Sequence, residues 1–343
     1  MKLLIITQVV DKKHPVLGFF HRWIEEFAKH VEVLHVICLE EGAHQLPANV
    51  HVHSLGKEAG KSRLTYVWRF YRLTISLRHE YDQVFVHMNQ IYVLLGAPLW
   101  RIWGKETGLW YAHGKVSLSL RCAVTMSNLV FTSTSEGLRI ETGKKRIVGQ
   151  GIDTDLFTVI KRNPDDILRL ITVGRIAPSK NIDTLLRAAA LLRGENIPFH
   201  FKIIGVAITE KEQEYEVYVK NLASQLSLDS HVEWVGGVMH EKLPPLLQKS
   251  DIFVHDGSTN SLDKTLLEAV LCGCVVVSSN PAYKNITDSL SSGLIFPPHD
   301  YYVLAEIIKI RQDSGKILAI KESIFNKSNI KNFITDVLEE YFE

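Results

Sequence analysis

The sequence predicts an α/β protein with two domains, each built around a parallel sheet. Short buried strands alternate along the chain with glycine-bearing loops and amphipathic helices, for example at 2–30 and at 168–193. The chain has 343 residues, of which 46% are hydrophobic, and this exceeds what one core usually supports. Together these observations predict two sheets whose strands end at shared edges.

Composition excludes several classes of protein. The net charge is +1, which is far from the charge of a nucleic-acid-binding domain, so no nucleic acid is expected as a partner. The cysteines do not have the spacing of zinc ligands, and we expect reduced thiols. Because there is neither a signal-peptide pattern nor an apolar run of membrane-spanning length, we expect a cytoplasmic protein, at most peripheral to the inner face of the membrane.

The first half of the chain begins with a strand, a loop and a helix. Lys2–Gln8 is predicted as a strand, a loop containing Gly18 follows, and the helix ends near His30. This unit is Rossmann-like, and ligands of such folds meet the carboxyl ends of the strands. His113 follows another predicted strand, Leu109–Ala112, and therefore falls at that edge. A histidine with a purely structural role explains this position equally well.

Two basic segments follow in the same half. Residues 56–62, GKEAGKS, have three residues between their glycines where a phosphate-binding P-loop needs four, so we interpret them as a surface loop. Residues 61–79 carry five basic side chains and no acidic one. Helical spacing groups their apolar side chains into one stripe: Leu64, Val67, Trp68, Tyr71 and Ile75. This helix could lie on an anionic bilayer, or it could cover the sheet with a solvated basic face, which is commoner in α/β folds and is the interpretation we favour.

The second half repeats the pattern after a polar linker at 161–166. A predicted strand at 168–173 is followed by a predicted helix at 182–193. The loop between them carries Arg175 and Lys180 at the edge of the sheet where ligands bind. Two cations there can neutralise the negative charge of a departing group, although a solvated basic loop would have the same composition.

The most informative stretch is Asp251–Ser279. It begins with a short buried strand, continues through a polar loop into a helix at about Leu262–Leu271, and ends in a strand from Val275. Ser261 can cap this helix, so that the N–H groups of its first turn face phosphate or sugar oxygens. Glu268 lies two turns into the same helix.

These motifs resemble those of one family. Glu268 is followed by an alanine and then by Cys272-Gly273, as in the second half of the signature of the retaining nucleotide-sugar glycosyltransferases of family 4, which have the GT-B fold. The resemblance implies two Rossmann-like domains that face each other across a cleft and a final helix that crosses back to the first domain. We therefore expect an acceptor-binding domain at 1–163, a nucleotide-sugar-binding domain at 164–326 and a closing helix at 327–343.

The chain departs from the signature at its first glutamate, eight positions before the second, where Asn260 stands. In the family this glutamate accepts hydrogen bonds from sugar hydroxyls and places charge near the anomeric carbon. An amide can bond but supplies no charge. We expect Asp263, three residues further on, to compensate in part.

The resemblance also implies roles for single residues. Arg175 and Lys180 are expected to stabilise the departing nucleoside diphosphate, with His113 beside the sugar or the acceptor. Glu268 is expected to hold the ribose hydroxyls, which suits a group that only accepts hydrogen bonds. The other donor contacts that we expect come from glycines and loop residues: Gly18, Gly174, Gly205, Val238, Met239, Asn260, Ser261, Leu262, Asp263 and Lys264. For Gly18 a flexible turn, and for Val238 and Met239 simple packing, are equally plausible.

Residues 148–157, VGQGIDTDLF, contain an Asp-x-Asp pair, Asp153 and Asp155, of the kind that chelates a metal in another glycosyltransferase fold. We favour a hinge, because the segment resembles the family's Asn-Gly-Val-Asp-x-x-x-Phe hinge with Gln150 in place of the asparagine, and no further ligand cluster accompanies it. We therefore expect no metal and no cofactor, with a UDP- or GDP-sugar as co-substrate.

The sequence thus predicts an enzyme that moves a sugar from a nucleotide-sugar to a hydroxyl group of a glycan or a lipid-linked glycan. The family implies retention of the anomeric configuration. Because no nucleophile is evident, we expect a same-face route assisted by a diphosphate oxygen. Two alternatives remain open: a nucleotide-sugar 2-epimerase-like isomerase on the same fold, and a donor-binding protein without transferase activity.

Overall fold

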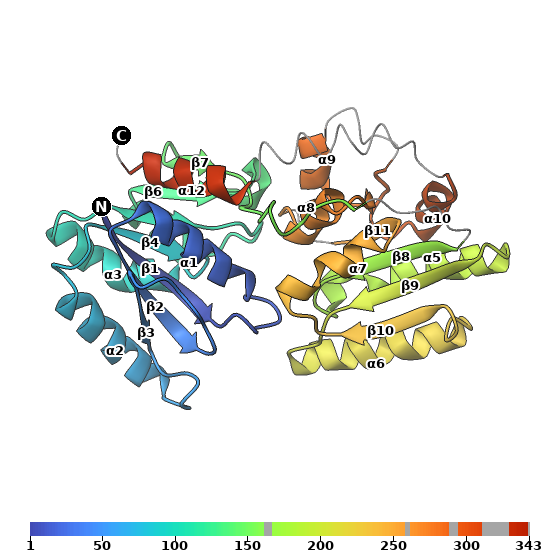
Figure 1. Ribbon diagram of the computed structural model, residues 1–343, viewed down its shortest axis with the longest axis horizontal. Helices are drawn as coiled ribbons and strands as arrows, with labels where there is room; N and C mark the ends of the chain where they lie inside the picture. The colour runs from blue at the N-terminus through green and yellow to red at the C-terminus, as the bar shows by residue number, and fades with distance from the viewer. Residues whose placement is uncertain (161–166, 258–260, 288–293, 311–328, 342–343) are drawn as a thin grey trace. The chain divides into compact units, whose positions relative to one another are not determined.

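The computed structural model describes residues 1–160, 167–257, 261–287, 294–310 and 329–341 (Figure 1). The chain divides into two compact units. The first unit is Met1–Gly151 together with Ser328–Glu343, and the second unit is Ile152–Lys327. Each unit contains one parallel sheet with helices packed against it, as the alternation of strands and helices in the sequence predicts.

The sheet of the first unit has seven strands in the order β3-β2-β1-β4-β5-β6-β7. Every neighbouring pair is parallel. The order reverses between β1 and β4, which is the place where open α/β sheets bind ligands. The strands are β1 (Lys2–Val10), β2 (Val33–Glu41), β3 (Val50–Ser54), β4 (Gln83–His87), β5 (Thr107–Trp110), β6 (Leu129–Thr132) and β7 (Lys145–Ile147).

Helices cover both faces of this sheet. Because side chains alternate along a strand, Leu3 and Ile5 enter one core while Leu4 and Ile6 enter the other. The first core is closed by α1 (Phe19–His30) and α12 (Ile330–Glu339), and the second by α2 (Arg63–Ser76), α3 (Ile91–Ile102) and α4 (Leu118–Met126) (Figure 1).

The closing helix α12 packs in the first unit, as the resemblance implied. The rings of Trp23 on α1 and Phe333 on α12 lie 4.2 Å apart between centroids, and the Trp23 indole donates a hydrogen bond to the carbonyl of Gly151 at 2.8 Å. Chain segments far apart in sequence therefore share one core.

The second unit has five parallel strands in the order β10-β9-β8-β11-β12. They are β8 (Leu168–Val173), β9 (Phe199–Ile204), β10 (Val232–Gly236), β11 (Ile252–His255) and β12 (Val275–Ser278). Its α-helices are α5 (Ile182–Gly194), α6 (Glu210–Gln225), α7 (Pro244–Gln248), α8 (Lys264–Leu271), α9 (Pro281–Thr287) and α10 (Tyr301–Lys309). Short 3₁₀ turns cover Ser135–Gly137 in the first unit and Pro178–Lys180 and His240–Lys242 in the second.

The two units meet in the chain at Gly151–Ile152, ahead of the boundary that we expected at 163. The reason is that the hinge-like segment contributes Ile152 and Phe157 to the core of the second unit. The linker expected at 161–166 lies outside the described residues.

Helix α2 covers the sheet, as the favoured interpretation has it, but through a different face from most of the predicted stripe. Leu64 and Trp68, which belong to the predicted stripe, have exposed fractions of 83% and 59%. The helix instead turns Phe70 and Thr74 inward, one helical turn apart. The sequence holds two apolar stripes, and the stripe that we chose faces solvent.

None of the helices in the described part of the chain combines the length and the apolar character needed to span a bilayer.

Candidate functional site

The predicted donor-binding loops leave the carboxyl ends of strands in the second sheet, which share one edge because the strands are parallel. A pocket opens at this edge. It is lined by Thr172, Val173, Gly174, Arg175, Lys180, Ile182, Ile203, Ile204 and His255. Three predicted site residues, Gly174, Arg175 and Lys180, therefore line one pocket, together with His255, to which we assigned no role from the sequence.

Glycine is required where the loops after β8 and β9 approach each other. Gly205 has φ +153°, and a Cβ built on it would lie only 1.7 Å from the carbonyl oxygen of Gly174. A Cβ on Gly174 would lie 3.4 Å from Cε of Lys180, which is ordinary contact. Gly205 thus permits a close backbone approach beside the pocket, and any other residue there would push the two loops apart.

Arg175 is held by a carboxylate from α6. Its guanidinium donates to Glu212 at 2.8 Å, and the same glutamate accepts the backbone N–H groups of Ile208 and Thr209 at 2.9 and 3.1 Å. Burial would raise the pKa of Glu212, but these backbone hydrogen bonds and the charge of Arg175 outweigh burial and lower it. Because a guanidinium has five N–H donors, Arg175 can keep this contact and still bind a phosphate oxygen.

Lys180 is held by a carboxylate from the loop before α8. Its ammonium donates to Oδ2 of Asp263, and Nε2 of His255 lies 2.7 Å from the same oxygen. The other ring nitrogen of His255 lies 3.1 Å from the hydroxyl of Ser278 on β12. Burial would raise the pKa of Asp263, but the charge of Lys180 and the hydrogen bond from His255 hold it well below its usual range.

The start of α8 differs from the prediction. The helix begins at Lys264 with Asp263 as its N-cap residue, and the side chain of Asp263 makes no capping hydrogen bond, because its carboxylate is held by Lys180 and His255. The proposed cap, Ser261, was therefore wrong: it is buried two residues earlier, and its carbonyl accepts the side-chain amide of Asn280 at 2.9 Å.

Within the same stretch, Leu262 packs into the core of the second unit. Asn260, the residue in place of the first signature glutamate, lies outside the described residues.

Glu268 lies on the inner side of α8 with an exposed fraction of 1%, so it is not a solvated helix glutamate. Its Oε1 lies 2.8 Å from Nε2 of His240, whose ring packs 5.0 Å from that of Phe157. Lys264 lies one turn earlier on α8. Burial lowers the pKa of Lys264 to about 7, although the charges of Glu268 and Asp153 act in the opposite direction.

Val238 and Met239 follow the end of β10. Val238 is half-buried against the core of the second unit, and Met239 precedes the 3₁₀ turn at His240–Lys242. Packing accounts for Val238, and the backbone of this loop leads directly to His240, the partner of Glu268.

Two predicted residues lie in the first unit. Gly18 immediately precedes α1, and a Cβ there would lie 2.7 Å from the carbonyl oxygen of His14, so the turn requires glycine for steric reasons. His113 follows β5 and is exposed, with Nδ1 accepting the N–H of Lys115 at 3.1 Å. Both lie beyond the carboxyl ends of strands, as predicted.

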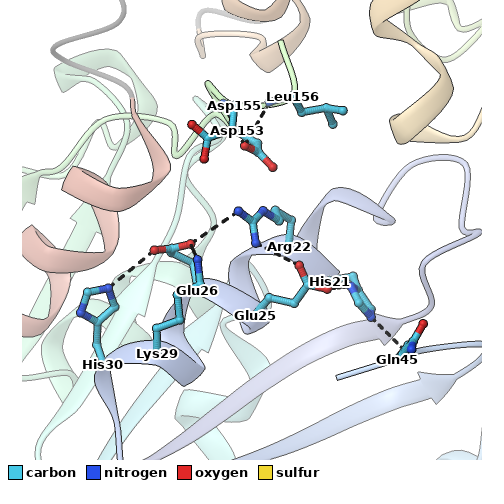
Figure 2. Close-up of polar contacts among 10 residues, drawn as sticks. All are labelled: His21, Arg22, Glu25, Glu26, Lys29, His30, Gln45, Asp153, Asp155 and Leu156. Atoms are coloured by element: carbon cyan, nitrogen blue, oxygen red, sulfur yellow. Dashed lines mark hydrogen bonds and ion pairs between the residues drawn. The ribbon is translucent and has the colours of Figure 1, made fainter. Parts of the chain in front are cut away.

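The polar side chains of α1 are paired with one another (Figure 2). Glu26 is buried, and the ammonium of Lys29 lies 2.7 Å from its carboxylate. A ring nitrogen of His30 and a guanidinium nitrogen of Arg22 each lie 3.7 Å from the same carboxylate. Such contacts three and four residues apart stabilise the helix.

Figure 2 also shows the Asp-x-Asp segment in the second unit. Oδ1 of Asp153 accepts the backbone N–H groups of Asp155 and Leu156 at 3.2 and 3.3 Å. The first carboxylate therefore closes its own turn. Across the part of the chain that the structure describes, no group of three or more His, Cys, Asp or Glu residues is arranged to hold a metal ion.

Sequence reasoning missed four residues of this site. His255 ends a strand and His240 follows a glycine pair, so their position at the ligand-binding edge was a usable signal. Glu212 and Ser278 gave no such signal, because their partners are 37 and 23 positions away in the chain.

Comparisons with known proteins agree with this arrangement. Residues 154–317 match the family model described as glycosyl transferases group 1. The D-inositol 3-phosphate glycosyltransferase of Mycolicibacterium smegmatis is 26% identical over 170 residues, which are 47% of this chain and 37% of that protein. The gpi3 subunit of phosphatidylinositol N-acetylglucosaminyltransferase from Schizosaccharomyces pombe is 23% identical over 152 residues, 44% of this chain and 31% of that protein. The match thus spans about a third of the length of these relatives.

Solved structures resemble the chain over its whole length. The Anabaena protein HepE in complex with UDP has a TM-score of 0.80 at 17% identity and covers 99% of both chains. The sucrose-phosphate synthase of Thermosynechococcus elongatus has a TM-score of 0.80 at 15% identity, covering 100% of this chain and 98% of that one. With its two Rossmann-like units this chain therefore has the GT-B fold, and most of its second unit matches the model of the glycosyl transferases group 1.

Proposed function

We propose that the chain is a glycosyltransferase that takes its sugar from a nucleotide-sugar. The observation that carries the proposal is the pocket at the carboxyl edge of the second sheet, where Arg175 and Lys180 both line the wall. The pocket lies within the residues that match the family. Solved structures of the similar Anabaena protein hold UDP and UDP-glucose, which supports a nucleotide-sugar as the ligand.

In the proposed reaction an acceptor hydroxyl attacks the anomeric carbon and the bond to the nucleoside diphosphate breaks. Arg175 and Lys180 stabilise the negative charge that develops on the leaving oxygen, a task for preorganised cations in a pocket. Their counter-ions Glu212 and Asp263 hold both side chains in place before the donor arrives. We propose that this pair takes the place of a metal ion, and that the configuration is retained through attack from the face of the departing diphosphate.

Glu268 is proposed to bind the ribose of the donor. A carboxylate accepts two hydroxyl hydrogen bonds well, and its burial on α8 favours a fixed orientation. His240 contacts it and would orient it. In the first unit, Gly18 and His113 are proposed to contact the acceptor or the transferred sugar.

The acceptor is proposed to be a glycan or a lipid-linked glycan reached at an anionic membrane surface. The exposed face of α2 supports this, because Leu64 and Trp68 project into solvent while the segment 61–79 carries only positive charge. The guanidinium of Arg72 lies 5.0 Å from the centre of the Trp68 ring, so cation and aromatic group are presented together.

Incubation with UDP- and GDP-sugars and candidate acceptors tests the proposal. Diphosphate release that depends on an acceptor supports transfer. Interconversion of the sugar without an acceptor would favour an epimerase, and binding without turnover would favour a donor-binding protein; either result would overturn the proposal.

A further inference from the structure

A chain of hydrogen bonds leads from the pocket into the sheet of the second unit. It joins the ammonium of Lys180 to the carboxylate of Asp263, this carboxylate to the ring of His255, and the ring to the hydroxyl of Ser278. His255 and Ser278 are buried at the ends of two adjacent strands, β11 and β12. Asp263 is thus tied to rigid elements, although it lies in a loop.

The hydrogen bonds assign a proton to His255. The ionised carboxylate of Asp263 can only accept hydrogen bonds, so Nε2 of His255, 2.7 Å away, carries a proton and donates it. In the neutral ring Nδ1 is then the acceptor for the hydroxyl of Ser278, whose oxygen in turn accepts the N–H of Asn280 at 3.1 Å. A Cβ on Gly257 would lie 2.5 Å from Cε1 of the ring, so the backbone packs against it and restricts its rotation.

The position of Asp263 in the chain makes this use of its carboxylate unusual. Aspartate at an N-cap normally accepts N–H groups of the first helical turn, yet here the side chain of Asp263 makes no such hydrogen bond. The carboxylate instead points at Lys180, one of the two cations of the pocket. The Asp263 carboxylate therefore partly neutralises the ammonium charge of Lys180, which would otherwise attract an anionic ligand to the pocket.

We propose that Asp263, held in place by His255, positions Lys180 in the pocket and weakens the affinity of the pocket for anions by competing with them for the ammonium. The inference rests on the proposed function in taking the anion to be the diphosphate of a nucleotide-sugar. An ammonium has three N–H donors, so Lys180 can hold Asp263 and a phosphate oxygen together. The nearby carboxylate repels that phosphate, and this repulsion favours release of the diphosphate product.

Amine labelling of Lys180, followed by mass spectrometry, tests the inference without a donor. The probe is inorganic pyrophosphate, and its affinity is measured as protection of Lys180 from the label. Asp263→Asn should raise the labelling rate, because the amine loses its counter-charge, and pyrophosphate should protect at a concentration about tenfold lower than in the unchanged protein. Asp229→Asn, which removes an exposed carboxylate of the same unit, should change neither quantity.

Variants of His255 test the positioning role separately. His255→Ala should accelerate labelling of Lys180 because Asp263 loses its anchor, and His255→Gln, which keeps an N–H donor on the side chain, should return the rate toward its original value. The inference would be overturned if pyrophosphate protected Lys180 in Asp263→Asn no better than in the unchanged protein. It would also be overturned if pyrophosphate protected Lys180 in neither protein. If no nucleotide-sugar is turned over while Asp263→Asn still binds pyrophosphate more tightly, the proposed function fails and the inference stands.

Discussion

Replacing Lys180 with alanine removes one of the two cations in the pocket and leaves the Asp263 carboxylate without its ion-pair partner. Loss of a preorganised group that stabilises leaving charge lowers kcat by roughly 10²–10³, equivalent to about 2.7–4 kcal/mol. The abandoned carboxylate adds repulsion toward the diphosphate. We therefore expect Lys180→Ala to reduce kcat by about 10³, at the upper end of this range.

A double variant separates the loss of the cation from the repulsion by the unpaired carboxylate. Lys180→Ala combined with Asp263→Asn removes both charges of the ion pair. We expect its kcat to be about tenfold higher than that of Lys180→Ala alone, since one unpaired charge is more harmful than the loss of both charges. The assay is acceptor-dependent release of nucleoside diphosphate. Lys249→Ala, an exposed lysine of the same unit, is the control, and urea unfolding verifies that each variant folds.

Two results would refute this reasoning. Turnover by Lys180→Ala within threefold of the unchanged protein would mean that the ammonium does not stabilise the leaving group. A double variant slower than the single one would mean that Asp263 contributes to the reaction by itself.

The fold and the exposed face of α2 give further expectations. Gly205→Ala should destabilise the protein by about 1–3 kcal/mol in urea unfolding, because its Cβ would lie 1.7 Å from a carbonyl oxygen, whereas Gly194→Ala, with nothing within 4 Å, should not. Burial lowers the pKa of Lys264 from 10.5 to about 7, so between these pH values the unfolded chain binds more protons than the folded one, and the free energy of unfolding should rise from pH 7 to 10. Lys264→Met should flatten this rise in urea unfolding, and an unchanged slope would argue against a lowered pKa of Lys264. Replacing Leu64 and Trp68 by alanine should weaken co-sedimentation with anionic vesicles by about tenfold or more, with no binding to neutral vesicles expected in any variant.

The sheets and the site loops of the second unit could be predicted because their signals are local. Buried runs followed by glycine-bearing loops showed in the sequence where β8 and β11 end. Arg175 and Lys180 are five positions apart in one such loop, so their presence at the same pocket could be predicted. In the same way, the position of His113 after a strand was readable from the sequence.

Other features depend on contacts between distant residues and could not be predicted. Serine is a residue type that commonly caps helices, which is why Ser261 was predicted as the cap. Instead the N-cap residue is Asp263, whose carboxylate is fixed by Lys180 and His255, and α8 begins after it. Helical spacing gave α2 two candidate apolar stripes, and packing of Phe70 against the sheet decided between them.

In the proposed reaction side-chain cations, with no metal ion, receive the charge when a sugar leaves its nucleotide. The most direct measurement is acceptor-dependent release of UDP or GDP from a panel of nucleotide-sugars, with and without excess EDTA. We predict release at an undiminished rate in EDTA, lost when Arg175 and Lys180 are both replaced by alanine. Release that stops in EDTA and returns with a divalent cation, or that persists in the double variant, would contradict the claim.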